Sequence, residues 1–428
     1  MSGDQSGHTA PSKSTTDQCQ RCGQNEATQN IRTTKLCDPC FLRHIQTRPI
    51  KRIEALKAST RGPKPTNPKA PPRPFQQPEP ETYLLALSGG PSSLALLHIL
   101  STHISNQLQK SNRASYRLHI VHVPLSSSSD SLTPPPLQQI QPLFPQHTWT
   151  TLPLTTALQT WTPPPSLLPS SISPASFSAL PAQEKLTHLL TLPRSRTAQL
   201  DLQNLLLDKA LLAFARTHAI STVLRGDSAT RLAEKVLGDV AKGRGGALSS
   251  ALSEGFIPAN GDRSAENNGQ ANGGGEGQGE GERERERGGK VRVAFPMREV
   301  LRKDAVSYVR IAGVRAGETP LGSLVVGGGT EGDGLEKVGK KTRMMRDLAI
   351  DELVGEYFSD VEGRYPGIVS NVVRTVGKLE VRSEGGARCG CCGGFVGEDD
   401  GGWEEGAGTG AGSDRVEGLC GRCERDFA

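Results

Sequence analysis

The sequence predicts an α/β fold built on a doubly wound, mainly parallel sheet. Short apolar runs typical of buried strands alternate with longer segments of helical periodicity, which is the pattern of a parallel sheet covered by helices. Two of these runs end directly in short polar loops that contain glycine, at 88–90 and at 226–228. Ligands of such sheets bind beyond the carboxyl ends of the strands. We therefore expect the two loops to face one another across a crevice.

The elements of the core follow from its apolar periodicity. An apolar run at 84–87 is the first strand, and the Leu-rich pattern at 94–100 begins the helix that follows it. The other predicted elements are strands at 117–123, 222–224 and 291–295, helices at 198–217, 229–240 and 303–312, and a short helix at 45–56 that precedes the core.

The composition limits how much of the chain can form a packed core. Of the 428 residues, 35% are hydrophobic and 4% aromatic, and the chain contains 49 Gly and 30 Pro. This apolar content is too low to offset the ordering entropy of the whole chain. We expect a disordered tail at 1–18, a Pro-rich linker at 61–80, and a core at 81–380 with disordered, low-complexity insertions at 126–182 and 255–289.

Two pairs of cysteines near the N-terminus have the spacing of a zinc site. Cys19 and Cys22 form one pair, Cys37 and Cys40 the other, and fourteen residues separate the pairs. Each pair aims two thiolates at one tetrahedral ion, and the intervening loop is just short of the usual length of about 15–20 residues. Because four thiolates leave no open coordination position, we predict a structural zinc ion in a module at 19–60.

Further cysteines near the C-terminus form similar pairs, Cys389 with Cys392 and Cys420 with Cys423. The long loop between these pairs is mostly Gly-rich. We predict a second zinc module at 381–428, with a redox role or unliganded thiols as the alternatives. Cys391 is then a spare or an alternative ligand.

The chain shows no sign of membrane insertion or secretion. No apolar run reaches membrane-spanning length, and the N-terminus lacks the charged start and apolar stretch of a secretory signal. We expect a cytoplasmic protein with no membrane partner. Its nine cysteines are then reduced thiols or metal ligands rather than disulfides.

The positive charge is concentrated in one stretch, although the net charge of +5 is mild. Nine Lys and Arg residues lie within 43–73, and only Glu54 opposes them. A polyanion partner accounts for this stretch, and so does a solvated helix face followed by a basic linker. The composition alone does not decide between these interpretations.

The loop after the first strand reads Ser88, Gly89, Gly90, Pro91, Ser92, Ser93. A glycine loop at a helix N-terminus offers backbone N–H groups and the positive end of the helix dipole to a phosphate. The loop resembles the PP-loop, the pyrophosphate-binding Ser-Gly-Gly-x-Asp-Ser signature of enzymes that adenylate a substrate, but Ser92 replaces the Asp. The alternative is a plain strand-to-helix turn with Ser88 near the N-cap.

A second element, after the strand at 222–224, resembles the Gly-His-x-x-Asp-Asp-x-x-Glu-Thr element of PP-loop tRNA-modifying enzymes. It begins at Gly226 and Asp227, and Thr230 and Arg231 replace its acidic pair. The order of these motifs along the chain resembles the noncatalytic branch, the cytoplasmic tRNA 2-thiolation protein 2 family, over most of 19–425. Further segments that carry the resemblance are 243–246, 295–300, 365–375 and the flanking cysteine pairs.

The resemblance implies a function and a set of partners. It implies a heterodimer with a catalytic PP-loop paralogue that replaces the C2 oxygen of wobble uridine-34 by sulfur in tRNA Lys, tRNA Glu and tRNA Gln, giving 5-methoxycarbonylmethyl-2-thiouridine. The sulfur would come from the thiocarboxylated C-terminus of a ubiquitin-related modifier, and a role in conjugating that modifier to proteins is also suggested. Residues 43–73 and 235–244 are then candidates for tRNA contact.

The residues of the core argue against catalysis by this chain. No cysteine occurs between Cys40 and Cys389, so the core offers no thiolate as a nucleophile or cluster ligand. The hydroxyl of Ser92 is a poor substitute for a carboxylate in binding Mg²⁺. We predict a noncatalytic subunit. A residual ATP site would consist of Ser88, Gly89, Gly90, Ser92, Ser93, Gly226 and Asp227.

Two other functions are open at this point. The chain could be an ATP-dependent adenylating enzyme that tolerates Ser92. It could also be a zinc-finger adaptor of ubiquitin-like conjugation that relies on its two four-cysteine clusters. Nucleotide hydrolysis by the isolated chain would distinguish the adenylating enzyme from a noncatalytic subunit. Removal of the core would distinguish the adaptor, which would still bind its partner, from a thiolation subunit, which would lose its function.

Overall fold

A computed structural model describes residues 18–60, 79–125, 140–164, 172–193, 195–245, 291–315 and 348–379, with a few further positions between 168 and 257. The predicted N-terminal tail, the linker at 61–80 and the insertion at 255–289 lie almost wholly outside the described residues. The predicted C-terminal zinc module, with Cys389, Cys392, Cys420 and Cys423, lies outside them entirely.

The central feature is a six-stranded sheet with the order β5-β4-β3-β6-β8-β7. Five strands are parallel, and β7 pairs antiparallel with β8 at one edge. The strands are β3 (Glu81–Ala86), β4 (Tyr116–His122), β5 (Thr148–Thr151), β6 (Thr222–Arg225), β7 (Phe256–Ile257) and β8 (Val291–Ala294). The predicted doubly wound, mainly parallel sheet is confirmed. Because β4 and β6 pair with opposite sides of β3, the switch point of the topology lies at β3.

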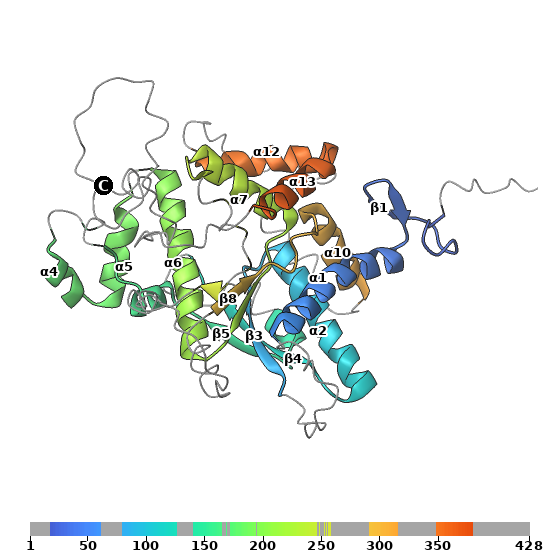
Figure 1. The fold of residues 1–428 in the computed structure, drawn as a ribbon, viewed down its shortest axis with the longest axis horizontal. Coiled ribbons are helices and arrows are strands. Elements are labelled where there is room, and N and C mark those ends of the chain that lie inside the picture. The colour runs from blue at the N-terminus through green and yellow to red at the C-terminus, as the bar shows by residue number, and fades with distance from the viewer. Residues whose placement is uncertain are drawn as a thin grey trace, which may run out of the picture.

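Helices cover both faces of the sheet (Figure 1). Successive side chains of a strand point to opposite faces, so Leu85 packs with α1, α2 and α10 whereas Leu84 packs with η3, α5 and α6. The helices of the first face are α1 (Asp38–Thr60), α2 (Pro91–Ser111) and α10 (Arg302–Arg315). Those of the second face are η3 (Leu154–Gln159), α5 (Ala182–Thr191) and α6 (Arg196–Thr217).

A third apolar cluster joins α7 (Ala229–Ala241), α12 (Ile350–Arg364) and α13 (Pro366–Val376). Phe358 and Val369 are buried in it, and α7 packs against both other helices. The remaining short elements are β1 (Gln29–Ile31), β2 (Thr34–Leu36), η2 (Gln141–Leu143) and α4 (Pro174–Ala179). None of the described helices is long and apolar enough to cross a membrane.

Helix α1 attaches the cysteine-containing N-terminal segment to the sheet. The buried residues Phe41, Ile45, Pro49 and Ile53 are four positions apart and therefore share one face of the helix. This face packs against α2 and α10 in the same apolar cluster as the sheet. The helix is longer than the predicted 45–56. Its N-terminal end reaches back to the second cysteine pair, and the helix continues through Pro49.

The stretch 126–182 differs from the predicted disordered insertion. Within it, β5 pairs with β4 as a strand of the sheet, and Ile140 and Trp161 are buried. The prediction of an insertion is therefore wrong for 140–161. The strand was missed because it reads Thr-Trp-Thr-Thr, which lacks the apolar run typical of a buried parallel strand.

Candidate functional site

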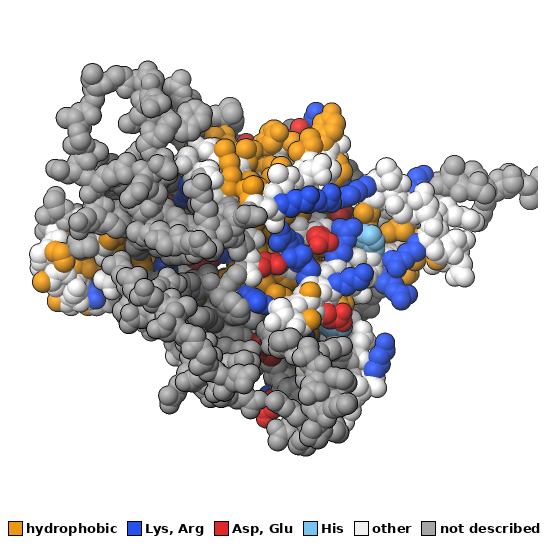
Figure 2. All heavy atoms as spheres, in the orientation of Figure 1, with side chains coloured by type: hydrophobic (Ala, Val, Ile, Leu, Met, Phe, Trp, Pro, Cys, Tyr) orange, Lys and Arg blue, Asp and Glu red, His pale blue; other side chains and the backbone are white. Residues whose placement is uncertain are grey.

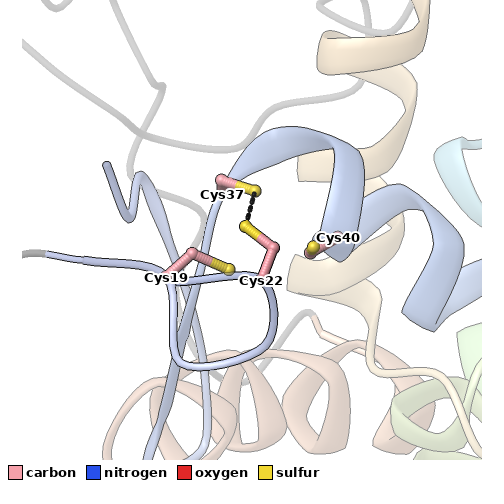
Figure 3. Close-up of side chains that lie close together, drawn as sticks. All are labelled: Cys19, Cys22, Cys37 and Cys40. Carbon is pink, nitrogen blue, oxygen red and sulfur yellow. Dashed lines mark hydrogen bonds between the residues drawn. The ribbon is translucent and has the colours of Figure 1, made fainter. Parts of the chain in front are cut away.

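The four N-terminal cysteines come together in space (Figure 3). Their sulfur atoms all lie within 4.8 Å of one another, and the Sγ atoms of Cys22 and Cys37 are 3.7 Å apart. Cys19 and Cys22 lie in the turn before the hairpin of β1 and β2. Cys37 follows β2 directly, and Cys40 lies in the first turn of α1. This geometry matches the prediction that the thiols of the two pairs point toward one common position.

Local structure holds the first cysteine pair in a tight turn. The N–H of Gly23 donates to the carbonyl of Cys19 at 2.8 Å, and Gly23 has a φ of +64°, which favours glycine. Burial opposes ionisation of Cys19, but hydrogen bonds from the backbone of Cys37, Cys22 and Arg21 outweigh it and lower the pKa of this thiol to about 6. A thiol with this pKa is ready to bind a cation as thiolate.

The cluster fits a metal with tetrahedral sulfur coordination. A Zn–S bond of about 2.3 Å places the sulfur atoms of a tetrahedral site about 3.8 Å apart, close to the Cys22–Cys37 separation. Burial, together with hydrogen bonding of the Cys40 thiol to the other cysteine sulfurs, raises the pKa of Cys40 to about 12. Because the four sulfur atoms lie this close together, these cysteines could bind a metal.

The glycine loop lies where the sequence predicts, between β3 and α2. Gly89 has a φ of +81°, and the hydroxyl of Ser93 donates to the carbonyl of Gly90 at 2.9 Å. The Oγ atoms of Ser88 and Ser93 are 3.1 Å apart. Because Pro91 begins α2 and has no N–H, the helix offers an anion one backbone donor fewer than an ordinary helix N-terminus. The hydroxyls of the loop thus serve mainly its own conformation.

The second glycine loop packs directly against the first, whereas the sequence predicted a crevice between them. A Cβ atom at Gly226 would lie 2.6 Å from the Cα of Ser93, so only glycine fits where the end of β6 meets α2. The two predicted loops therefore lie side by side at the carboxyl ends of β3 and β6.

The carboxylate of the second loop is already engaged by the chain itself. Asp227 accepts a 2.9 Å ion pair from Nε of Arg225, and Arg225 also pairs with Asp208. The charges of Asp208 and Asp227 raise the pKa of Arg225, so it keeps its charge. With a hydroxyl at Ser92 and Asp227 neutralised, these residues do not fit a magnesium pyrophosphate group.

The altered residues of the second element hold the structure together. The hydroxyl of Thr230 donates to Glu362 at 2.8 Å and accepts from the N–H of Arg302 at 3.0 Å. Glu234 is buried and accepts from Arg231 at 3.1 Å and from Arg302 at 2.6 Å. These hydrogen bonds connect α7 to α10 and α12, so the polar groups of these residues bind one another.

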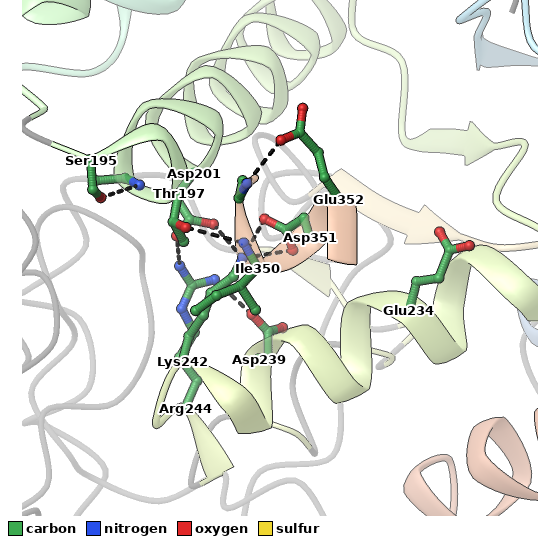
Figure 4. A network of polar contacts seen from close by, with 12 residues as sticks. Ser195, Thr197, Asp201, Glu234, Asp239, Lys242, Arg244, Ile350, Asp351 and Glu352 are labelled. Carbon is green, nitrogen blue, oxygen red and sulfur yellow. Dashed lines mark hydrogen bonds and ion pairs between the residues drawn. The ribbon is translucent and has the colours of Figure 1, made fainter. Parts of the chain in front are cut away.

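The two basic side chains at the C-terminal end of one predicted tRNA-contact segment form ion pairs within the chain (Figure 4). The Nζ of Lys242 lies 2.8 Å from Asp201 and 2.6 Å from Asp351, and its side chain is 5% exposed. Arg244 pairs with Asp201 at 2.8 Å and with Asp239 at 2.7 Å. The prediction that 235–244 contacts tRNA is therefore wrong for Lys242 and Arg244, which join α6, α7 and α12.

A histidine beside the glycine loop was not singled out by sequence reasoning. His122 ends β4, and its Nδ1 lies 2.8 Å from the carbonyl of Leu87, just before the loop. Its Nε2 is buried and has no hydrogen-bond partner among the described residues. The histidine lies in an apolar run, so no sequence signal distinguished it from a structural residue.

Comparison with known proteins identifies relatives that span the whole chain. The cytoplasmic tRNA 2-thiolation protein 2 of Phaeosphaeria nodorum is 30% identical over 96% of this chain and 95% of the relative. The chain belongs to this family. The tRNA 2-thiolation protein 2 of Neosartorya fischeri is 28% identical over 97% of the chain and 98% of its own length. The family model of cytoplasmic tRNA 2-thiolation protein 2 matches residues 349–418, which include α12 and α13.

A comparison of this chain with solved structures also returned a match. It is the U34-tRNA thiolase NcsA from Methanococcus maripaludis with its [4Fe-4S] cluster. The alignment covers 86% of this chain and 90% of that one, with a TM-score of 0.46 and 12% sequence identity.

Proposed function

We propose that this chain is a noncatalytic subunit for 2-thiolation of tRNA in the cytoplasm. The observation that carries the proposal is the similarity to cytoplasmic tRNA 2-thiolation proteins over 96% of the chain. The substrate we propose is wobble uridine-34 in tRNA Lys, tRNA Glu and tRNA Gln, with sulfur from the thiocarboxylated C-terminus of a ubiquitin-related modifier.

The two loops at the carboxyl ends of β3 and β6 support a noncatalytic role. Asp227 is paired with Arg225, Ser92 supplies a hydroxyl instead of a carboxylate, and residues 41–388 contain no cysteine. The described residues therefore offer neither a ligand set for a metal-bound pyrophosphate nor a thiolate near the loops that could accept sulfur. A catalytic PP-loop paralogue would supply these groups.

An exposed apolar surface supports docking of that paralogue. Eight large hydrophobic side chains are exposed among the described residues, and six of them belong to α7, α12, α13 or the positions next to them. These six are Leu237, Val240, Tyr357, Tyr365, Ile368 and Leu379. Figure 2 shows hydrophobic side chains gathered over these helices. A contiguous apolar patch is typical of a protein interface, and four of its residues lie within the segment matched by the family model.

We further propose that the four N-terminal cysteines hold a zinc ion. Cys19, Cys22, Cys37 and Cys40 would bind it as thiolates, and the ion would fix the β1–β2 hairpin against the first turn of α1. Its role is structural, because four protein ligands leave no position for substrate. A second zinc ion at Cys389, Cys392, Cys420 and Cys423 is proposed from their spacing alone.

The experiment that tests the proposed function is mass spectrometry of tRNA nucleosides from cells that lack the gene. We expect 5-methoxycarbonylmethyl-2-thiouridine to disappear, the unthiolated nucleoside to accumulate, and re-expression of the chain to restore the modification. Normal thiolation in the deleted cells would contradict the proposal. It would favour an adaptor in conjugation of a ubiquitin-like modifier, which uses the cysteine modules without the core.

A further inference from the structure

A basic groove lies between the cysteine-containing segment, α1 and β8. The cavity has a volume of about 840 Å³. Its walls are formed by residues of α1 and by residues of the segments outside that helix. Five cations line it, from three separate parts of the chain: Arg21, Arg48, Lys51, Arg52 and Arg292. Two carboxylates, Glu254 and Glu299, oppose them. Figure 2 shows Lys and Arg side chains gathered on this face over α1, with few acidic ones among them.

The cations differ in how far the chain itself occupies them. Arg52 pairs with Glu254 at 2.6 Å and with Glu299 at 3.3 Å, so it is neutralised locally. Lys51 is exposed, with no ion pair or hydrogen bond to any described residue, and Arg21 is exposed and donates only to the carbonyl of Cys40. Arg48 donates to the carbonyl of Glu299 rather than to a carboxylate. Uncompensated positive charge therefore lies on both walls of the groove.

The neighbouring His44 reports the same positive field. Burial lowers its pKa, and the charges of Arg48, Arg21 and Arg32 lower it further. A site that disfavours a further proton in this way favours an anion.

We propose that this groove binds the sugar-phosphate backbone of RNA and does not read base sequence. Arg48, Lys51 and Arg52 line one wall at helical spacing, and Arg21 reaches in from the cysteine turn. The other lining side chains are mainly short polar or aliphatic, such as Thr34, Thr47 and Ser59, and no Phe, Tyr or Trp is among them. Phosphate contacts use such cations and hydroxyls, whereas recognition of unpaired bases relies on aromatic stacking.

This inference rests on the proposed function, in which RNA is the substrate, and it adds where the RNA backbone lies. Binding without base readout suits a subunit that must accept several tRNAs. It also gives the cysteine cluster a task, since Arg21 lies between Cys19 and Cys22 and is positioned by the turn that those residues form.

The test compares charge reversals at matched lysines in the full-length, zinc-loaded chain purified with its bound partner. Lys51→Glu changes the groove, whereas Lys110→Glu makes the same change at an exposed position of α2 outside it. Affinity for a tRNA transcript is measured at several salt concentrations. We expect Lys51→Glu to weaken binding about tenfold and to reduce the slope of log K against log [salt] by about 0.7–0.9. Lys110→Glu should stay within about twofold of the unmutated chain.

Further arms separate the alternatives. We expect a structured RNA of scrambled sequence to bind as tightly as tRNA, and Arg21→Glu to behave like Lys51→Glu. Equal loss for Lys51→Glu and Lys110→Glu, or no measurable RNA binding by the unmutated complex, would overturn the proposal. So would a Lys51→Glu variant that binds RNA normally but fails to restore thiolation in cells, because a protein partner would then occupy the groove. Normal thiolation in deleted cells would instead refute the proposed function and leave RNA binding by the groove intact.

Discussion

Gly226 is the residue that sets how closely the two glycine loops approach. Its missing Cβ leaves room for the backbone of Ser93, which would otherwise lie 2.6 Å away. The contact involves main-chain atoms, so no side-chain rotation can relieve a clash. The sequence predicted that these loops would face one another across a crevice, but it did not reveal that the end of β6 and the start of α2 are in direct contact at this point.

We predict that Gly226→Ala destabilises the protein by about 1–3 kcal/mol, because the backbone of β6 or α2 must shift. Gly245→Ala is the matched control, since a Cβ there meets nothing within 4 Å. Denaturant unfolding monitored by circular dichroism measures both. Equal midpoints for the two variants would show that the close approach of the loops is not tightly packed.

At the scale of elements, the polar groups that join α6, α7 and α12 show that the charge pattern of a short sequence segment does not reveal ion pairs with distant residues. Lys242 is basic and near a helix end, which favoured a contact with tRNA. Its partners Asp201 and Asp351 are 41 and 109 residues away in the chain, so no local pattern could reveal them. The strands β3, β4, β6 and β8 were predictable for the converse reason, because each carries apolar, mostly β-branched or leucine side chains within its own short sequence.

We predict that Lys242→Ala lowers the free energy of unfolding by about 3 kcal/mol and leaves RNA affinity unchanged. The substitution leaves Asp351 without its partner in a poorly solvated position, and a broken buried pair costs this much. Lys235→Ala on the same helix is the control and should change stability little. A loss of RNA affinity in Lys242→Ala with unchanged stability would restore this lysine as a nucleic-acid contact.

We attribute the ordered conformation of the β1–β2 hairpin and of the start of α1 to metal binding. We predict that Cys22→Ser lowers the zinc content by one equivalent per chain and lowers the unfolding temperature, because three thiolates bind zinc more weakly than four. Metal analysis by mass spectrometry gives the stoichiometry. Gln24→Ser, at an exposed position of the same turn, should keep the metal. An unchanged zinc content in Cys22→Ser would rule out this cysteine as a ligand.

At the scale of the whole molecule, a mainly parallel sheet covered by helices carries two glycine loops that pack directly against each other at the carboxyl ends of β3 and β6. The N-terminal cysteine cluster shares one apolar core with the sheet through α1, α2 and α10. Most of the exposed apolar side chains lie on or next to α7, α12 and α13, and the basic groove lies along α1. On this account the chain provides RNA and protein contacts, while nucleotide chemistry takes place in a partner.

The measurement that tests this claim most directly is AMP release by the purified chain alone, with ATP labelled in the α-phosphate and unthiolated tRNA. The account predicts no AMP above a control without protein, because Asp227 is held by Arg225 and the loop lacks a carboxylate at Ser92. AMP formation above that background that is lost in the Ser93→Ala variant would contradict the account. It would show that the chain adenylates its substrate itself.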